Sequence, residues 1–416
     1  MSYVGNMKSE VEKESAGKFF VPTLTLVFFA ITISTPMLGL LPLDMAKTFF
    51  PESFVAGTSV AVQRAAIGAI TQISTVNSVF EAAFAVVMGA LVVRFKHKSL
   101  LLVGVLLLFI SAIGSFFAPT LPILQVFFAL EGAASIMVGI MGLTMVGEFL
   151  PSQKKAKAVG YLVAATSLAT LVGIPLIGLI TSFGGWRLNF MLFVLPVSVL
   201  GLILAFIALP RKSSIKPLVP DKNAYLTSFK QVLVNKFAVS CLIGGMLGSA
   251  VVVGLFAVTF YRQQFGVSLG FATGIMLVAA LMFVVASLVI GRLVGKTGAK
   301  KLTVIGALGN GIFTIVFFFM PNLWIALPLD MVHVWFGAAG FTAFSCLALD
   351  QVPQFRGTMM SMKSMFHNIG AAIGAAVGGA MLILFSSYQA VGIALGAISI
   401  ASGAVFYFLT KDPEEK

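Results

Sequence analysis

Two stretches 202 residues apart decide the fold of this chain: residues 87–98 read VMGALVVRFKHK, and residues 289–300 read VIGRLVGKTGAK. Each runs from apolar to basic and carries the pattern Gly-x-Leu, at Gly89 and Gly291. Other positions share the same offset: Gly104 with Gly306, Pro119 with Pro321, Pro151 with Pro353, Arg94 with Lys296, Lys98 with Lys300, and Lys154 with Arg356. A constant offset across three connections indicates an internal duplication.

Long apolar runs surround these stretches. Of the 416 residues, 59% are apolar and 10% are charged, which excludes a soluble globular enzyme and a disordered chain. A membrane-spanning helix needs about 20 apolar residues, so twelve would use about 240. We predict an all-α membrane protein of twelve transmembrane helices, at residues 19–43, 70–93, 100–117, 121–146, 158–182, 188–209, 237–261, 271–294, 302–320, 323–347, 362–385 and 388–409. The chain lacks the short segments of alternating polar and apolar residues that would indicate an outer-membrane β-barrel.

Six spans separate equivalent positions, so the two halves have the same orientation and form a parallel repeat of six-helix bundles. Two connections are longer than the others. The one at 210–236 holds three Pro and six Lys or Arg and is predicted to link the halves. The one at 44–69 is predicted to carry a short amphipathic surface helix. The predicted organisation is a cytoplasmic tail 1–18, bundles at 19–209 and 237–409, the linker 210–236, and a cytoplasmic tail 410–416.

The charged residues lie between the apolar runs. The net charge of +13 therefore bears on the orientation of the chain in the membrane and does not indicate nucleic-acid binding. With alternating sides, 23 of the 27 Lys and Arg fall on one side, and only Lys47, Arg64, Arg187 and Arg262 fall on the other. The positive-inside rule then puts both termini in the cytoplasm. We expect a multi-pass protein of the cell (plasma or inner) membrane. Cys241 and Cys346 lie inside apolar runs, so we expect neither a disulfide framework nor a metal site.

With these motifs, the chain resembles the major facilitator superfamily over essentially its whole length. The signature that follows span 2 in that family, Gly-x-Leu-Ala-Asp-Arg-x-Gly-Arg-Lys, is matched at Gly89, Leu91, Arg94 and Lys98. The second half matches it at Gly291, Leu293, Gly298 and Lys300. In span 5, Gly173-Ile-Pro175-Leu-Ile-Gly178 is followed by Gly-Trp-Arg187, a pattern similar to the drug- and sugar-efflux branch, near arabinose-efflux-permease-like proteins.

The resemblance implies the two-bundle major facilitator fold, and it implies gating or conformational roles for these motif residues and for Arg356. Three positions depart from the family pattern. Val93 replaces the Asp that helps to hold the cytoplasmic side closed, Lys96 replaces the second Gly, and Phe128 stands where span 4 often has Arg. Glu131 follows in the same span, so this chain loses a membrane Arg and gains an acid.

Ionisable residues inside apolar spans cost about 2.5–3.5 kcal/mol to insert, so they are functional candidates. Glu81 and Glu131 fall near the middle of spans 2 and 4, where such transporters place their sites. A carboxyl group that is protonated on one side and releases the proton on the other couples transport to protons; the alternative is a structural acid. Ser74, Asn77 and Ser78 share the helix face of Glu81, and with Ser135 they are our candidates for lining the substrate cavity.

In the second half, the offset of 202 relates Glu131 to His333. Asp330 precedes His333 by three residues, so the two can touch on one helix face. Both join the proton-coupling candidates, although a structural polar contact is the competing interpretation. Gly370, Gly374 and Gly378 form a stripe that favours close helix packing, and His367 favours a packing or gate role.

We predict a secondary transporter that exports a small organic molecule, drug-like or a sugar, in exchange for protons by alternating access, with no organic cofactor. Its partners would be the substrate and the lipid bilayer, with no nucleic acid, and it would work as a monomer. A metabolite importer or uniporter of the same fold is the alternative. The chain has no metalloprotease, nucleophile-elbow or phosphate-loop motif, which argues against a membrane enzyme, and it has no long soluble segment for a sensor.

Overall fold

The computed structural model describes residues 17–150, 152–210 and 229–412. Twelve helical stretches in this part are long and apolar enough to cross a membrane, and each overlaps one predicted span. No strand occurs among the described residues, so the predicted all-α membrane fold is confirmed. The predicted tail 1–18 and linker 210–236 fall largely outside the described part.

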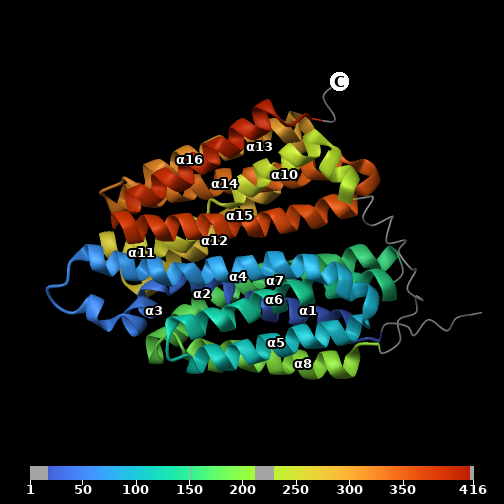
Figure 1. Cartoon of the computed structure of the whole chain (residues 1–416), viewed down its shortest axis with the longest axis horizontal. Helices are drawn as coiled ribbons and strands as arrows, with labels where there is room; N and C mark the ends of the chain where they lie inside the picture. Colours follow the sequence, from blue (N-terminus) through green and yellow to red (C-terminus); the bar gives the residue numbers. More distant parts are fainter. Residues whose placement is uncertain (1–16, 151, 211–228, 413–416) are drawn as a thin grey trace, which may run out of the picture.

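The first half is built from α1 (Phe20–Thr32), α2 (Thr35–Leu40), α3 (Pro42–Phe49), the short helix η1 (Pro51–Phe54), α4 (Val60–Arg94), α5 (His97–Phe117), α6 (Leu121–Phe149), α7 (Ser152–Gly184), a π-helical turn η2 (Phe190–Val194) and α8 (Leu195–Ala208). The second half is built from α10 (Lys236–Ser249), α11 (Gly254–Gln264), α12 (Leu269–Thr297), α13 (Ala299–Phe318), α14 (Leu323–Gln351), η3 (Pro353–Phe355), α15 (Arg356–Phe385) and α16 (Tyr388–Phe408). Figure 1 shows the two groups stacked on each other, with α4 and α15 side by side along the boundary.

The helix bounds repeat the offset found in the sequence. α6 begins at Leu121 and ends at Phe149, and α14 begins at Leu323 and ends at Gln351, each 202 residues later. Glu131 and His333 therefore occupy equivalent places, ten residues after the start of equivalent helices.

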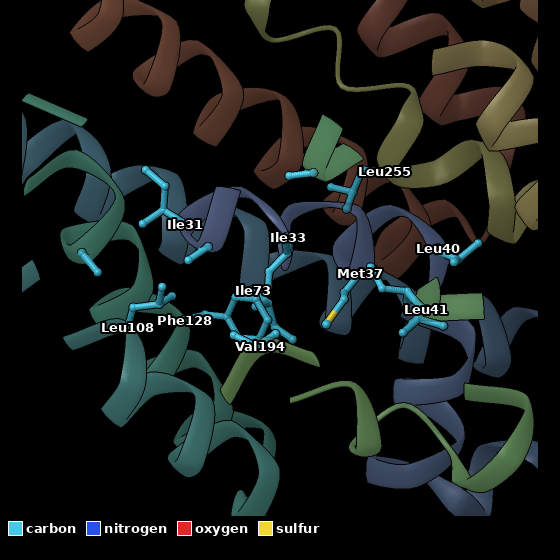
Figure 2. Packing of buried hydrophobic residues seen from close by; sticks show 14 of the residues in the cluster. Ile31, Ile33, Met37, Leu40, Leu41, Ile73, Leu108, Phe128, Val194 and Leu255 are labelled. Atoms are coloured by element: carbon cyan, nitrogen blue, oxygen red, sulfur yellow. The ribbon is translucent and has the colours of Figure 1, made fainter. Parts of the chain in front are cut away.

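Spans 1 and 7, predicted as continuous helices, are both interrupted. Span 1 breaks at Ile33 and Ser34, immediately before Thr35-Pro36; Pro has no N–H to donate and disfavours the helical conformation of the residue before it. Span 7 breaks between α10 and α11, where three consecutive valines reach Gly254, and β-branched residues and Gly are weak helix formers. The apolar side chains around the first break pack densely: Figure 2 shows Ile33 and Met37 beside Ile73, Phe128 and Val194, all almost fully buried.

The segment 44–69, predicted as a connection, is mostly helical, so the true connection between the helices is shorter than predicted. α3 continues to Phe49, and α4 begins at Val60, ten residues before the predicted span. These ten residues add about 15 Å of helix and carry Arg64. The hydropathy pattern missed them because this part of α4 packs on protein, where a polar residue does not face lipid.

Glycines let the helices of the second half approach closely. A Cβ added at Gly370 would lie 2.0 Å from the Met246 carbonyl oxygen, and one added at Gly374 would lie 1.8 Å from that of Ala250. Real Cβ atoms do not approach this closely, so the glycine stripe of α15 brings its backbone onto α10. The predicted packing role of the stripe is confirmed.

Candidate functional site

A buried carboxyl group faces the break in span 1. Glu131 on α6 is 6% exposed, and the Ser34 hydroxyl donates a hydrogen bond to its Oε1. Ser34 is available for this contact because it lies between α1 and α2 and not inside a regular helix. Ser34 was not predicted as a site residue; the sequence signal for it is the Ser-Thr-Pro run in the middle of an apolar span.

The second carboxyl group, Glu81, lies beside the first because α4 and α6 pack closely. A Cβ added at Gly132 would lie 2.5 Å from the Asn77 carbonyl oxygen and 3.2 Å from the Glu81 Cγ. Ser135, one turn after Glu131, forms a side-chain hydrogen bond with Glu81. The Glu81 and Glu131 carboxyl groups interact electrostatically. The structure thus brings together two acids whose proximity the sequence left open.

The remaining cavity candidates lie on the same face of α4. The Asn77 Nδ2 donates to the Phe128 carbonyl oxygen at 2.9 Å, and Ser78 is buried. Ser74 is half-buried. Asn77 is therefore engaged with α6, and a cavity-lining role for the stripe stays a prediction.

In the second half, Asp330 and His333 lie together on α14. His333 Nδ1 is 3.5 Å from Asp330 Oδ1, which is ion-pair range, but this nitrogen has no hydrogen-bond partner. Asp330 instead accepts a hydrogen bond from the Tyr261 hydroxyl at 3.1 Å. Tyr261, which was not predicted as a site residue, lies on α11 after the break in span 7. In each half, the interrupted first span therefore binds the acid of the fourth span.

A buried basic residue on α15, Lys363, was not predicted from the sequence. Lys363 is 8% exposed; its ammonium donates to the Ser345 hydroxyl at 2.6 Å and lies 4.8 Å from the Phe341 ring centroid. His367, one turn later, packs its ring on Phe341 at 5.8 Å, which agrees with the packing role predicted for it. Lys363 was overlooked because it sits at the edge of the predicted span, although its spacing of four from His367 was visible.

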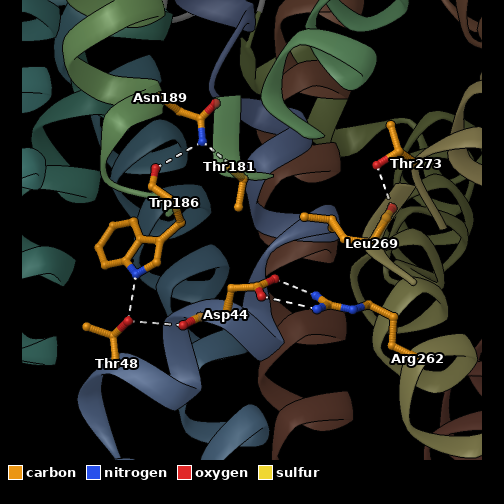
Figure 3. A network of polar contacts seen from close by, with 8 residues as sticks. All are labelled: Asp44, Thr48, Thr181, Trp186, Asn189, Arg262, Leu269 and Thr273. Carbon is orange, nitrogen blue, oxygen red and sulfur yellow. Dashed lines mark hydrogen bonds and ion pairs between the residues drawn. The ribbon is translucent and has the colours of Figure 1, made fainter. Parts of the chain in front are cut away.

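The two halves are joined at the end of the molecule opposite the start of α1. Figure 3 shows the bidentate ion pair between Arg262 of α11 and Asp44 of α3, with one bond of 3.1 Å. These two residues lie 218 positions apart in the sequence, on opposite halves of the molecule. The Trp186 indole donates to the Thr48 hydroxyl at 2.9 Å and supports α3 from the other side.

Arg64 makes a second connection between the halves. Its guanidinium donates to the Ser386 carbonyl oxygen at 2.9 Å, at the end of α15, where the last carbonyls lack helical partners. It also lies 5.1 Å from the Tyr388 ring centroid. Arg64 and Arg262 are two of the four basic residues assigned to the outer side, and both connect the halves.

Arg187, which closes the Gly-Trp-Arg motif, contacts elements outside spans 5 and 6. It donates to the Ala118 carbonyl oxygen at 2.6 Å, at the end of span 3. Its guanidinium stacks over Trp186 at 4.6 Å and Phe49 at 5.4 Å. Arg187 therefore ties the C-terminal end of α5 to α3.

The Gly-x-Pro-Leu-x-Gly motif lies on α7 where that helix meets both the break in span 1 and the other half. A Cβ added at Gly173 would lie 3.7 Å from the Ile33 carbonyl oxygen, and one added at Gly178 would lie 2.6 Å from Thr273 Oγ1 on α12. Pro175 lies inside α7, where it removes one backbone hydrogen bond. The motif thus gives α7 its close approach to the second half.

Replacing Gly178 by Val should separate α7 from α12, because the added atoms overlap Thr273. We expect substrate transport to fall strongly while the melting temperature changes little, since the overlap lies between the halves and not inside one. Transport in proteoliposomes and thermal melting in detergent measure the two effects. The matched control is Gly160→Val on the same helix, where an added Cβ meets no atom within 4 Å; equal loss in both variants would contradict the interpretation.

The signature motifs lie at the other end of the molecule. Gly89 and Leu91 lie in the last turns of α4, which ends at the exposed Arg94. Gly291 and Leu293 lie in the equivalent part of α12, and Gly298 ends that helix at φ +89°, a conformation that favours glycine. Arg356 begins α15, and its side chain lies outside the described part.

Lys98 has a clear structural role there. Its ammonium donates to the carbonyl oxygens of Phe206 at 2.7 Å and Leu209 at 2.6 Å. These carbonyls end α8, and a cation stabilises a helix C-terminus. Lys98 therefore holds the end of span 6 to the start of span 3.

A pocket of about 300 Å³ lies between the halves, lined by Thr32, Thr166, Ser167, Thr170, Leu171, Ala280, Phe283 and Val284. The first half contributes hydroxyl groups from α1 and α7, and the second half contributes apolar side chains from α12. The hydroxyls of Thr32 and Thr166 donate to carbonyl oxygens of their own helices, so their free lone pairs accept hydrogen bonds. The wall from the first half can therefore accept hydrogen bonds from donors on a ligand, and the wall from the second half can pack against an apolar surface of that ligand.

Comparison with known proteins identifies relatives for this fold. The profile of the Major Facilitator Superfamily matches residues 22–347 and 261–416. A probable sugar efflux transporter of Haemophilus influenzae is 26% identical over 199 residues, which are 46% of this chain and 47% of that protein. The corresponding protein of Pasteurella multocida is 25% identical over 63% of each chain. These alignments thus span about half to two thirds of the curated relatives.

Solved structures with the same fold include a D-xylose–proton symporter, with a TM-score of 0.76, 15% identity, and coverage of 95% of this chain and 98% of the other. A bacterial homolog of the human lysosomal transporter Spinster, in an inward-facing and unoccupied conformation, has a TM-score of 0.75 at 15% identity and covers 94% and 96%. At these identities, the likeness concerns the fold alone. Because the family profile matches most of its length, this chain belongs to the major facilitator superfamily.

Proposed function

We propose that this transporter exports a small organic molecule in exchange for protons, by rocking its two halves about a site between them. The observation that carries the proposal is the proximity of Glu81 and Glu131: Glu131 is buried, Glu81 is half-buried, and the two carboxyl groups interact electrostatically across two packed membrane spans. Two negative charges repel strongly in a medium of low dielectric constant. Taking up or releasing a proton therefore changes the interactions of the whole pair, which is what a coupling site requires.

The surroundings of the pair support a link to conformational change. Glu131 is bound by Ser34 at the break of span 1, and the same break faces Gly173 of α7. α7 in turn contacts α12 of the other half through Gly178. A change at the carboxyl pair therefore acts on the segment that touches the moving boundary.

The pocket between the halves supports a substrate with donors on one face and an apolar surface on the other. A sugar has this character, because its hydroxyls donate hydrogen bonds and its C–H faces pack on aromatic rings. Amphipathic drug-like molecules share it. The sugar efflux relatives support the sugar.

For orientation, we propose that both termini face the cytoplasm, as the distribution of basic residues indicates. In Figure 1, α1 begins and α16 ends at the same end of the molecule. The end joined by Asp44–Arg262 and Arg64 would then face outward, and the halves would be closed on the outer side in this structure.

Transport by purified protein in proteoliposomes tests the proposal. A pH gradient of one unit is applied, labelled pentoses, hexoses and lipophilic cations are offered, and a trapped pH dye follows the protons. One pH unit is worth about 1.4 kcal/mol, so one-for-one exchange accumulates substrate about tenfold against its gradient. Compounds that cross without accumulation or proton movement would identify a uniporter, and accumulation in the direction of the proton flow would identify an importer.

A further inference from the structure

A groove runs between the third and sixth spans of each half, and the two grooves differ at one end. In the second half the groove lies between α13 and α16 and has a volume of about 580 Å³; its lining is Thr297, Gly298, Lys300, Lys301, Val304, Ile305, Tyr407 and Asp412. In the first half the groove lies between α5 and α8, measures about 420 Å³, and is lined by apolar residues alone: Leu102, Val103, Leu106, Leu202, Ile203, Phe206 and Ile207. The offset of 202 relates Leu102 and Val103 to Val304 and Ile305.

The lysine at the end of the groove is used differently in the two halves. In the first half, Lys98 is buried and donates to two carbonyl oxygens of the end of α8. Its counterpart Lys300 uses only its backbone N–H, which donates to Asp412 at 3.4 Å. Within the described part of the chain, the ammonium groups of Lys300 and Lys301 form no hydrogen bond or ion pair. Among the residues that line this groove, two lysine ammonium groups stand against one carboxylate, that of Asp412, so the described lining carries a net positive charge at this end.

The position of this groove matches the membrane surface. The lysines stand in the first turn of α13, which is a membrane span of twenty residues, and the positive end of that helix adds to their potential. Tyr407 is 60% exposed and Ile305 is 44% exposed. Tyr is typical of the level of lipid headgroups. In our proposed orientation this end faces the cytoplasmic leaflet, which is rich in anionic lipid.

We propose that the groove between α13 and α16 binds an anionic phospholipid. Its phosphate would lie against Lys300 and Lys301, and one acyl chain would follow Val304, Ile305 and Tyr407 into the membrane. Charge complementarity and the continuity of an apolar wall with a basic end favour a lipid over a free phosphate ion. The first half offers the apolar groove without the headgroup site, because Lys98 is already engaged.

Native mass spectrometry of the full chain with added phosphatidylglycerol or phosphatidylcholine tests the proposal. Lys300→Gln combined with Lys301→Gln should weaken binding of phosphatidylglycerol roughly 30-fold, since each basic residue near the surface contributes about a factor of five. Phosphatidylcholine binding should not change. The matched control is Lys154→Gln combined with Lys155→Gln, which removes the same charge at the start of α7 and should retain the lipid.

Two further measurements separate a lipid from a free anion. Ile305→Trp keeps both lysines but fills the groove, so it should also reduce phosphatidylglycerol binding, and inorganic phosphate should not displace the lipid. Equal lipid retention by the wild type and the double Gln variant would overturn the proposal. Displacement by phosphate, with no effect of Ile305→Trp, would overturn it in favour of a free-anion site. Since these measurements follow binding and not flux, they stand apart from the test of proton-coupled export.

Discussion

Replacing Glu131 by Gln is expected to abolish proton-driven accumulation of substrate, from about tenfold at a gradient of one pH unit to none. Gln keeps the shape of the side chain and can still accept the hydrogen bond from Ser34. It cannot gain or lose a proton, and it removes the charge that Glu81 experiences. The variant should still exchange labelled for unlabelled substrate, because exchange needs binding and conformational change but no net proton movement.

The same proteoliposomes measure accumulation, proton movement and exchange for the wild type and the variant. Glu81→Gln should behave like Glu131→Gln, because removing either acid removes the electrostatic interaction between the two carboxyl groups. Ser34→Ala should weaken coupling less, since it removes one hydrogen bond and leaves both acids. Glu52→Gln serves as the control, because this carboxyl is exposed in η1. If Glu131→Gln still accumulated substrate tenfold, the pair would be structural.

Reversing one charge of the Asp44–Arg262 pair is expected to open the end of the molecule at which the halves are joined. In Asp44→Arg, two guanidinium groups would meet where a bidentate ion pair now holds α3 to α11. The pair is largely buried, with side chains 21% and 10% exposed. We expect a loss of about 1–3 kcal/mol for the joined conformation, a roughly 5- to 150-fold change in its population. Transport should fall because one of the two alternating states becomes rare.

The double exchange Asp44→Arg with Arg262→Asp should restore both the population and transport, which separates the ion pair from damage to either helix. Spin labels at Glu52 and Ser268, exposed on opposite halves, report the distance across this end in a variant without Cys241 and Cys346. Lys47→Glu reverses an exposed charge on the same helix and should leave the distance unchanged. An unchanged distance in Asp44→Arg would show that the pair does not hold the halves together.

Several features of this protein were determined by its sequence alone. The number of spans and their approximate positions follow from runs of apolar residues, because each helix satisfies its own backbone in lipid and is specified locally. The duplication was visible as a fixed offset, and the structure repeats it in the bounds of α6 and α14. Glu81 and Glu131 stood out as acids in apolar runs because an unpaired charge in a membrane is costly.

The tertiary structure decided which residues meet. Ser34 reaches Glu131 across 97 positions of sequence, and Asp44 reaches Arg262 across 218. Neither contact has a periodic signal, because each depends on a break or an end of one helix and on how another helix crosses it. The first turns of α4, around Arg64, were likewise not predicted as part of span 2. Hydropathy reports whether a residue suits lipid, whereas the packing of α4 on the second half decides whether a polar residue remains helical.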